Sequence, residues 1–363
     1  MRILVTGGAG FIGGNLVFQL LTLDGEVFVV DDLSSGSSDN LDPRAQFRKL
    51  DICSDEFRAV VRSFKPDVIV HLAAISSVAD SVKNPENTYR VNIEGTANVV
   101  GAAIESGVSR VVFASSAAVY GDPVSLPLRE ESLKSPLTPY GETKLEAERL
   151  IQTQLRDAGI DFAIFRFANV YGPRQGLGGE GGVVSTFASA LVAGETPSIE
   201  GDGKQIRDFI FVSDVVFALV SAIGGDIDFA GNPMEQVDAG VYNIGTGEGK
   251  SIEELAANFR MVAQFFGAYG SLPPREGDIR ESVLDSTRAR DTFEFMPNTS
   301  FDKGIEMTYA WFKARHEVDE AEEPEPEPFD MGDPLGFAGF DASGVAGGIG
   351  GFDASGVNGD GIK

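Results

Sequence analysis

A tyrosine and a lysine stand four residues apart near the start of a predicted helix. These residues are Tyr140 and Lys144, and their spacing places both side chains on one helical face. A lysine ammonium beside a phenol favours the phenolate, and lowering a tyrosine pKa from about 10 to near 7 requires roughly 4 kcal/mol. Ser115 and Ser116 follow the apolar run Val111–Ala114, at a strand end where open α/β sheets place ligands. Together these residues predict a proton-transfer site, although a bare tyrosine and lysine pair also occurs on solvated helices.

A glycine-rich turn at the N-terminus has the pattern of a dinucleotide-binding loop. The run Thr6-Gly7-Gly8-Ala9-Gly10-Phe11-Ile12-Gly13 follows a predicted strand and opens a helix. Glycines let the backbone approach a pyrophosphate, and the helix N-terminus offers free N–H groups. Asp31 and Asp32 end the second predicted strand, where an acid binds an adenosine ribose. A carboxylate there repels a 2′-phosphate, so the sequence favours NAD over NADP. A turn without a ligand is the alternative interpretation of the loop.

A second glycine cluster, Gly245-Thr246-Gly247-Glu248-Gly249-Lys250-Ser251, resembles a phosphate loop. The first glycine that such a loop requires would fall on Ile244, so the pattern fails. We interpret this cluster as a turn that caps a helix beginning near Ser251.

Strand and helix signals alternate in the first half of the chain. The strands read as continuous apolar runs, which is typical of a parallel sheet covered on both faces; they are expected at 3–5, 27–30, 68–70 and 111–113. The pattern predicts a Rossmann-like, doubly wound α/β fold. We expect a nucleotide-binding domain at 1–170, to which later segments return, and a smaller, irregular substrate-binding part at 171–316. Residues 317–363 are expected to be a disordered tail, first acidic and proline-rich, then glycine-rich.

The composition excludes several classes of protein. Cys53 is a single cysteine, and His71 and His316 lie far apart among the 363 residues, so neither an internal disulfide nor a metal cluster is expected. No apolar run reaches the roughly 20 residues of a membrane span. The net charge of −26 makes nucleic acid a poor partner. These observations predict a cytoplasmic protein without a membrane or nucleic-acid partner.

The negative charge is not confined to the tail. Residues 1–316 hold 43 acidic and 28 basic residues, a net charge of −15. A surface that is acidic and poor in lysine stays soluble where salt screens its self-repulsion. This pattern favours a salt-rich cytoplasm, and an acidic protein of ordinary salt conditions is the alternative.

From its motifs the chain resembles the extended short-chain dehydrogenase/reductases, and within them the UDP-hexose 4-epimerases, such as those that act on UDP-glucose or UDP-N-acetylglucosamine. The resemblance covers residues 1 to about 315. The matching segments are Thr6–Gly13, Asp31–Gly36, Asp51-Ile52, His71–Ala74, Asn92, Ser115–Gly121, Tyr140–Lys144 and Arg166–Pro173.

The resemblance implies a set of site residues. Ser116, Tyr140 and Lys144 would be catalytic. NAD would be bound by Gly7, Gly10, Phe11, Ile12, Gly13, Asp31, Asp32, Ser35, Gly36, Asp51, Ile52, Leu72, Ala73, Ala74, Asn92, Tyr140 and Lys144. The UDP-sugar would be bound by Ser116, Asn169, Arg207, Arg275, Asp278 and Ser282. Guanidinium groups suit a diphosphate, although surface ion pairs of Arg207 with Asp208 and of Arg275 with Glu276 are the alternative. A homodimer is also expected from the resemblance.

The resemblance also bears on the reaction type. Dehydratases and decarboxylases of this family carry acidic residues after the catalytic serine or threonine, where this chain has Ala117 and Ala118. Oxidation and re-reduction at C4, hence epimerisation, is therefore expected. A net oxidoreductase or lyase and a non-catalytic nucleotide sensor remain alternatives. Ser282 stands where a small residue is associated with tolerance of an N-acetyl group, so N-acetylated sugars are expected to fit.

Overall fold

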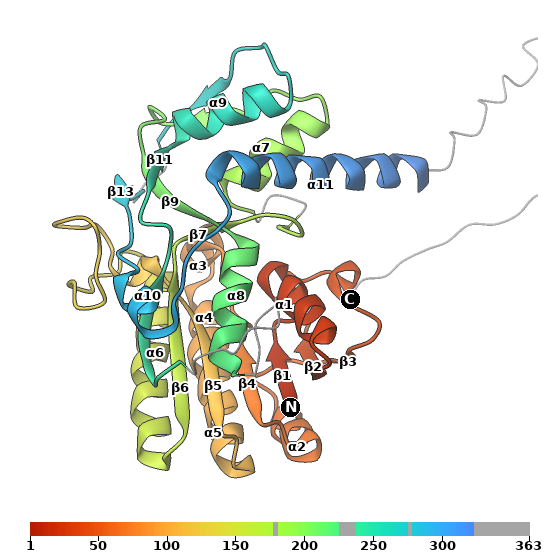
Figure 1. Ribbon diagram of the computed structural model, residues 1–363, viewed down its shortest axis with the longest axis vertical. Helices are drawn as coiled ribbons and strands as arrows, with labels where there is room; N and C mark the ends of the chain where they lie inside the picture. The colour runs from red at the N-terminus through yellow and green to blue at the C-terminus, as the bar shows by residue number, and fades with distance from the viewer. Residues whose placement is uncertain (177–180, 225–236, 275–277, 323–363) are drawn as a thin grey trace, which may run out of the picture. The chain divides into compact units, whose positions relative to one another are not determined.

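A parallel sheet forms the centre of the computed structural model, which describes residues 1–176, 181–224, 237–274 and 278–322. Within these residues seven strands pair in the order β10-β6-β5-β4-β1-β2-β3, all parallel. Their bounds are β1 Arg2–Thr6, β2 Glu26–Asp31, β3 Gln46–Lys49, β4 Val68–His71, β5 Arg110–Ser116, β6 Asp161–Phe167 and β10 Gly240–Ile244. The expected doubly wound α/β fold is confirmed (Figure 1).

Helices cover both faces of this sheet because alternate strand residues point to opposite sides. Val5 and Val29 pack toward α1 (Phe11–Thr22) and α8 (Val212–Ile223), while Leu4 packs into the opposite core. That second core includes residues of α2 (Asp55–Phe64), α5 (Thr96–Ser106) and α6 (Pro139–Ala158). Strands buried on both faces explain the continuous apolar runs in the sequence.

A smaller lobe lies beyond the carboxyl ends of the strands (Figure 1). Its strand β9 (Ile206–Phe211) pairs with β7 (Asn169–Tyr171), β11 (Gly249–Ser251) and β13 (Glu281–Ser282). The lobe has its own apolar core, which includes Phe187 and Phe259. Its further elements are α7 Val183–Val192, β8 Ser198–Glu200, α9 Ile252–Val262, β12 Gly270–Leu272 and α11 Phe301–Glu322.

The remaining described elements are short and connect the larger ones. They are η1 Ser38–Asn40, α3 Val78–Lys83, α4 Pro85–Tyr89, the π-helical η2 Arg90–Gly95, η3 Ala117–Val119 and α10 Thr287–Phe293. The segment at 38–40 follows β2, and the segment at 117–119 follows β5. Both connections therefore leave the sheet at the edge where ligands bind in this fold class.

Two segments late in the chain belong to the central sheet and its cover: α8 packs on α1, and β10 pairs with β6. The expected bounds of the domains stay predictions. The end expected at residue 316 falls inside α11, which continues to Glu322. Residues 317–322, expected in the acidic linker, are therefore helical. The remainder of the expected tail, 323–363, lies outside the described residues.

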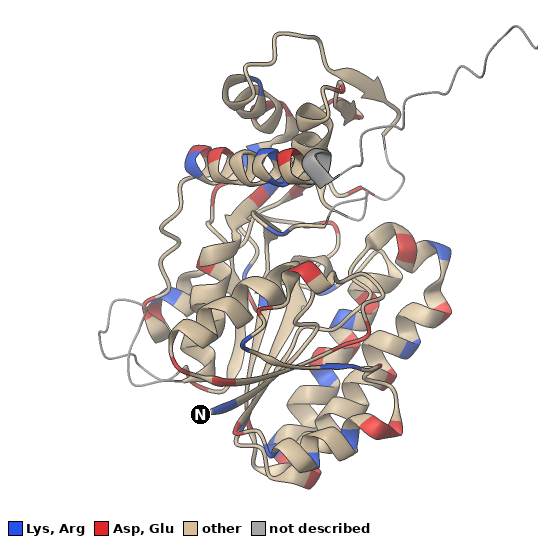
Figure 2. Ribbon diagram, turned by 90° about the vertical axis from the view of Figure 1, so that its right-hand side faces the viewer, with Lys and Arg blue, Asp and Glu red and all other residues tan. Residues whose placement is uncertain are grey.

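Charged residues lie mainly on helices and connecting segments, and α11 carries both signs (Figure 2). The strands of the central sheet are mostly uncharged in the same view, as their burial requires. Across the described part of the chain, no helix combines the length and apolar character that a membrane span demands.

Candidate active site

A cavity of about 850 Å³ lies at the carboxyl ends of the central strands, beside the N-terminus of α1. Most of the residues expected to bind NAD line it: Gly7, Gly10, Phe11, Ile12, Gly13, Asp31, Asp32, Ser35, Gly36, Asp51, Ile52, Leu72, Ala73, Ala74 and Tyr140. Asn169, expected at the substrate, lines it as well. Residues from distant parts of the sequence thus meet around one cavity, and their roles in binding NAD stay predictions.

The glycine loop is held so tightly that larger residues would not fit. Gly7 has φ +72°, and a Cβ built on it would lie 2.6 Å from the Ala73 backbone nitrogen. A Cβ on Gly13 would collide with the carbonyl oxygen of Gly7. The loop therefore turns directly into α1, and the free N–H groups at the start of that helix favour an anion in the cavity.

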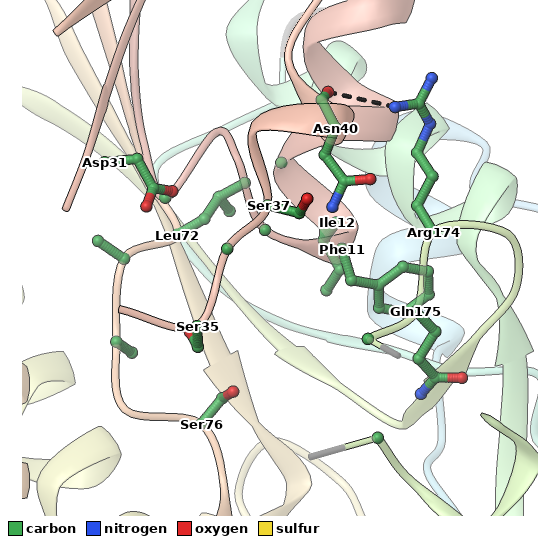
Figure 3. Close-up of a pocket in the computed structure, with 18 of the residues that line it drawn as sticks. Phe11, Ile12, Asp31, Ser35, Ser37, Asn40, Leu72, Ser76, Arg174 and Gln175 are labelled. Atoms are coloured by element: carbon green, nitrogen blue, oxygen red, sulfur yellow. Dashed lines mark hydrogen bonds between the residues drawn. The ribbon is translucent and has the colours of Figure 1, made fainter. Parts of the chain in front are cut away.

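The two aspartates after β2 organise the neighbouring backbone. Asp31 accepts hydrogen bonds from the backbone N–H of Ala9 (2.9 Å) and of Leu33 (2.8 Å), and Asp32 accepts one from the N–H of Ser34. Burial raises the pKa of Asp31, the two backbone hydrogen bonds oppose this, and the charge of Asp32 adds to it. Figure 3 shows the Asp31 side chain beside the cavity, close to the loop that carries Leu72.

Another acid contributes to the cavity wall after β3. Asp51 accepts a hydrogen bond from the backbone N–H of Cys53 (2.8 Å) and forms an ion pair with Arg90 (2.9 Å). Burial raises the pKa of Asp51, but these two partners outweigh burial and hold it below its ordinary value. The carboxylate is therefore fixed in its charged form beside Ile52, where a contact with NAD was expected.

The opposite wall of the cavity comes from the smaller lobe. Arg174 reaches back toward α1 and donates a hydrogen bond to the Asn40 carbonyl oxygen (3.2 Å). Helix α11 places Trp311 and Arg315 on the cavity wall, and Arg315 forms an ion pair with Asp39 (2.6 Å). Both arginines thereby link this lobe to the segment that follows β2.

Helix α6 carries the expected catalytic pair. Its N-cap, Thr138, accepts a hydrogen bond from the Gly141 backbone, and Pro139 occupies the first turn, as helix starts prefer. Tyr140 lines the cavity. The Lys144 Nζ donates to the Ala114 carbonyl oxygen (2.8 Å) and lies 5.9 Å from the centroid of the Tyr140 ring. The spacing of four does place both side chains together.

The three side chains form one group at the end of β5. The Ser116 hydroxyl lies near enough to Tyr140 to act on the tyrosine pKa, and the Ser116 Oγ accepts a hydrogen bond from the Ala118 backbone N–H. Burial raises the pKa of Tyr140, and the Ser116 hydroxyl only partly opposes it. This direction differs from the lowered pKa that we expected, because desolvation of the phenolate exceeds what the chain's own groups supply. Burial also lowers the pKa of Lys144 to about 8.

Asn92 has a different position from the one expected for a cofactor ligand. It is buried and does not line the cavity. Its side-chain oxygen accepts from the Ile75 backbone N–H (2.8 Å), and its amide donates to the Ile75 carbonyl and to Thr143 Oγ1. Asn92 therefore supports the loop after β4 from behind. A direct cofactor contact stays a prediction.

The residues expected to bind UDP gather in the smaller lobe. Arg207 forms an ion pair with Asp278, and strand pairing places Ser282 opposite Arg207. Asp278 also lines a second cavity of about 660 Å³. Arg275 lies outside the described residues. The alternative pairing with Glu276 lies outside them as well.

Asp208 takes a role that sequence reasoning missed. It accepts hydrogen bonds from the Thr246 backbone N–H and hydroxyl, and from the backbone N–H groups of Gly247 and Leu284. The Gly245–Ser251 cluster is therefore a turn tied to a buried carboxylate. As expected, Ser251 caps the helix that follows.

Comparisons with known proteins agree with this geometry. The model of the NAD dependent epimerase/dehydratase family matches residues 3–245. The chain belongs to this family. It is 41% identical over 322 residues to a UDP-glucose 4-epimerase of Mycolicibacterium smegmatis, covering 86% of this chain and 99% of that protein.

Two solved structures of the family are similar over nearly their whole length. A UDP-glucose 4-epimerase from Thermotoga maritima with UDP-glucose has 36% identity and a TM-score of 0.82, covering 87% of this chain and 100% of that chain. A UDP-N-acetylglucosamine 4-epimerase from Methanobrevibacter ruminantium, in complex with UDP-N-acetylmuramic acid, has 31% identity and a TM-score of 0.79. The coverage is 86% of this chain and 98% of that one.

The cofactor of the family, NAD, fits the larger cavity. The close approach at Gly7 and the N-terminus of α1 suit a pyrophosphate, and the acids after β2 suit an adenosine ribose. The opposite wall, with Arg174 and Arg315, is an addition that sequence reasoning missed. Arg174 directly follows the matched motif that ends at Pro173, which was the available signal. No local sequence pattern indicated Arg315, because its position at the cavity depends on how α11 packs in the fold.

Proposed function

We propose that this chain catalyses the NAD-dependent 4-epimerisation of a UDP-hexose. The observation that carries the proposal is the convergence of Ser116, Tyr140 and Lys144 beside the cavity that fits NAD. The residues that follow Ser116 are Ala117 and Ala118, in η3. An acid at these positions would favour loss of water or of carbon dioxide, so their apolar character supports a reaction without elimination.

The chain's own groups supply the proton transfer. NAD⁺, when bound, supplies a reversible hydride acceptor. Tyr140 takes the proton of the sugar hydroxyl at C4, with the nearby Ser116 hydroxyl as the relay between them. The cationic Lys144, 5.9 Å from the tyrosine ring, favours the phenolate that burial disfavours. After the 4-keto sugar turns over in the site, the hydride would return to C4 on the opposite face and the same tyrosine would return the proton, so there is no net oxidation.

Product analysis tests this proposal. The chain is incubated with UDP-glucose or UDP-galactose, the products are separated, and absorbance reports any accumulated NADH. We expect the 4-epimer without stoichiometric NADH, and turnover of Tyr140→Phe reduced about 10²- to 10⁴-fold. Steady accumulation of NADH would indicate a net oxidoreductase. Loss of carbon dioxide or water would indicate a lyase, and binding without conversion would indicate a nucleotide sensor.

The sugar itself is a finer part of the proposal. Ser282 faces the same side of the sheet as its strand partner Arg207, and its small side chain leaves space for an acetamido group. The similarity to an N-acetylglucosamine nucleotide epimerase supports the same substrate class. We expect conversion of UDP-N-acetylglucosamine alongside UDP-glucose, with Ser282→Tyr selectively removing the N-acetyl activity. A wild-type chain inert toward N-acetyl sugars would refute this part alone.

The proposed enzyme is also a cytoplasmic homodimer. This part rests on the family resemblance and on the absence of a membrane-spanning helix among the described residues. Light scattering should give twice the chain mass of 38.5 kDa. A monomer that retains full activity would contradict the dimer and leave the reaction unchanged.

A further inference from the structure

Helix α6 presents a third polar residue on the face that carries Tyr140 and Lys144. Glu148 follows Lys144 by four residues, as Lys144 follows Tyr140, so the three lie along one side of the helix. The lysine is 4% exposed and the glutamate 1%. A buried carboxylate is costly unless charges and hydrogen bonds compensate for it.

Three hydrogen bonds and one charge compensate for the burial of the Glu148 carboxylate. Arg166 on β6 donates two hydrogen bonds to Glu148, from Nε (2.9 Å) and Nη2 (2.7 Å). Ser115 donates a third, from its hydroxyl (2.5 Å). Arg166 in turn donates to the Tyr120 hydroxyl and the Glu130 carbonyl. The carboxylate is therefore fixed directly behind the last residues of β5.

We propose that Glu148 is a positioning residue that keeps Lys144 cationic beside Tyr140, with Arg166 holding the carboxylate in place. The inference rests on the proposed function, in which Lys144 is a catalytic residue. It adds Glu148 as a residue that acts through Lys144. The Glu148 carboxylate is buried and is held by Arg166 and Ser115, so its role is to act on Lys144 and not on the reacting atoms.

The charges around Lys144 support this role. Burial lowers the pKa of Lys144 to about 8, and the negative charge of Glu148 opposes that fall. On α6 the groups that face the lysine are Tyr140 and Glu148, and β5 contributes the Ala114 carbonyl and the Phe113 ring. From β4 comes His71, whose pKa burial lowers to about 3, with the lysine charge adding to the effect. His71 is therefore neutral, and the positive charge that competes with Lys144 for Glu148 is that of Arg166 on β6.

The pH profile of Glu148→Gln tests the proposal. If cationic Lys144 is required, turnover falls as pH rises through the lysine pKa. Removing the carboxylate lowers that pKa, so we expect the alkaline limb to move about one pH unit lower, a roughly tenfold loss at a fixed pH on the limb. Glu148→Asp should restore the limb toward its original position. Ser115→Ala, which removes a hydrogen bond but no charge, is the matched control and should leave the limb in place.

A second readout does not need activity. The folded-state pKa of Lys144 lies below its ordinary value of 10.5, so the free energy of unfolding should rise with pH between about 8 and 10.5. In Glu148→Gln this rise should begin at lower pH. The paired variant Glu148→Gln with Arg166→Gln leaves no unpaired buried charge, and should shift in the same direction if the single variant does not fold.

The outcomes distinguish a failure of the Glu148 inference from a failure of the proposed function. A uniform loss of turnover across pH, with an unmoved limb and an unmoved onset in unfolding, would show that Glu148 is only structural and overturn the inference. Near-normal activity of Tyr140→Phe would instead overturn the proposed function, while the unfolding experiment would still decide whether Glu148 controls the charge of Lys144.

Discussion

Replacing Asp208 by asparagine should destabilise the smaller lobe from its centre. Asp208 is 1% exposed. One carboxylate oxygen accepts from Thr246 twice, at 2.9 and 2.6 Å, and the other accepts from the N–H groups of Gly247 (3.1 Å) and Leu284 (3.3 Å). An amide supplies one oxygen and one NH₂ group. In its best orientation the oxygen accepts from Gly247 and Leu284, and the NH₂ group faces the Thr246 hydroxyl, which can accept, and the Thr246 backbone N–H, which cannot.

The magnitude follows from these contacts. A buried donor left without an acceptor costs about 1–3 kcal/mol, and here one backbone N–H, that of Thr246, loses its acceptor. Burial raises the pKa of Asp208, which means that desolvation of the charge already opposes folding, and a neutral amide removes that part. We therefore expect the free energy of unfolding to fall by about 1–2 kcal/mol.

Urea unfolding followed by circular dichroism measures this change. Asp202→Asn is the control, because Asp202 is an exposed residue of the same lobe that pairs with Arg280, and we expect little effect there. Binding of UDP, measured by calorimetry, should weaken in Asp208→Asn because the neighbouring Arg207 lies on the same strand. A loss of less than about 0.5 kcal/mol would refute the assignment of Asp208 as the support of this lobe.

Three further predictions concern the cofactor, the tail and salt. NAD should bind at least about tenfold more tightly than NADP because carboxylates follow β2, and Asp32→Ser should reduce this difference in affinity. A titration that gives equal affinities for the wild-type chain would contradict this. A chain ending at Glu322 should stay folded and active, whereas one ending at residue 310 should lose NAD binding with the cavity-lining part of α11; a large fall in melting temperature for the longer chain would show that the tail docks. Molar KCl should raise the melting temperature through screening of the net charge of −15 in residues 1–316, and a flat or falling curve would remove the halophilic interpretation.

The motifs predicted those parts of the site that depend on local sequence. The glycine loop, the acids after β2 and the α6 pair follow from short spacings, and the structure brings them together around one cavity. Strand β3, in contrast, has no apolar pattern: Gln46, Phe47, Arg48 and Lys49 are all exposed, and only pairing with β2 makes them a strand.

The residues that sequence reasoning missed act across long distances in the chain. Arg315 meets Asp39, and Asp208 meets Leu284, contacts that no local spacing encodes. The pKa of Tyr140 was misjudged for a related reason. Spacing gives the distance to Lys144 along the helix, but desolvation depends on everything that packs around the phenol.

The wall that α11 adds to the larger cavity offers a way to follow the reaction by fluorescence. Trp311 is the single tryptophan of the chain, and it lines that wall. Its emission therefore comes from one place, with no background from other indoles. Reduced nicotinamide absorbs in the range where tryptophan emits and the oxidised form does not, so energy transfer from Trp311 would register the redox state of the cofactor inside the cavity during turnover.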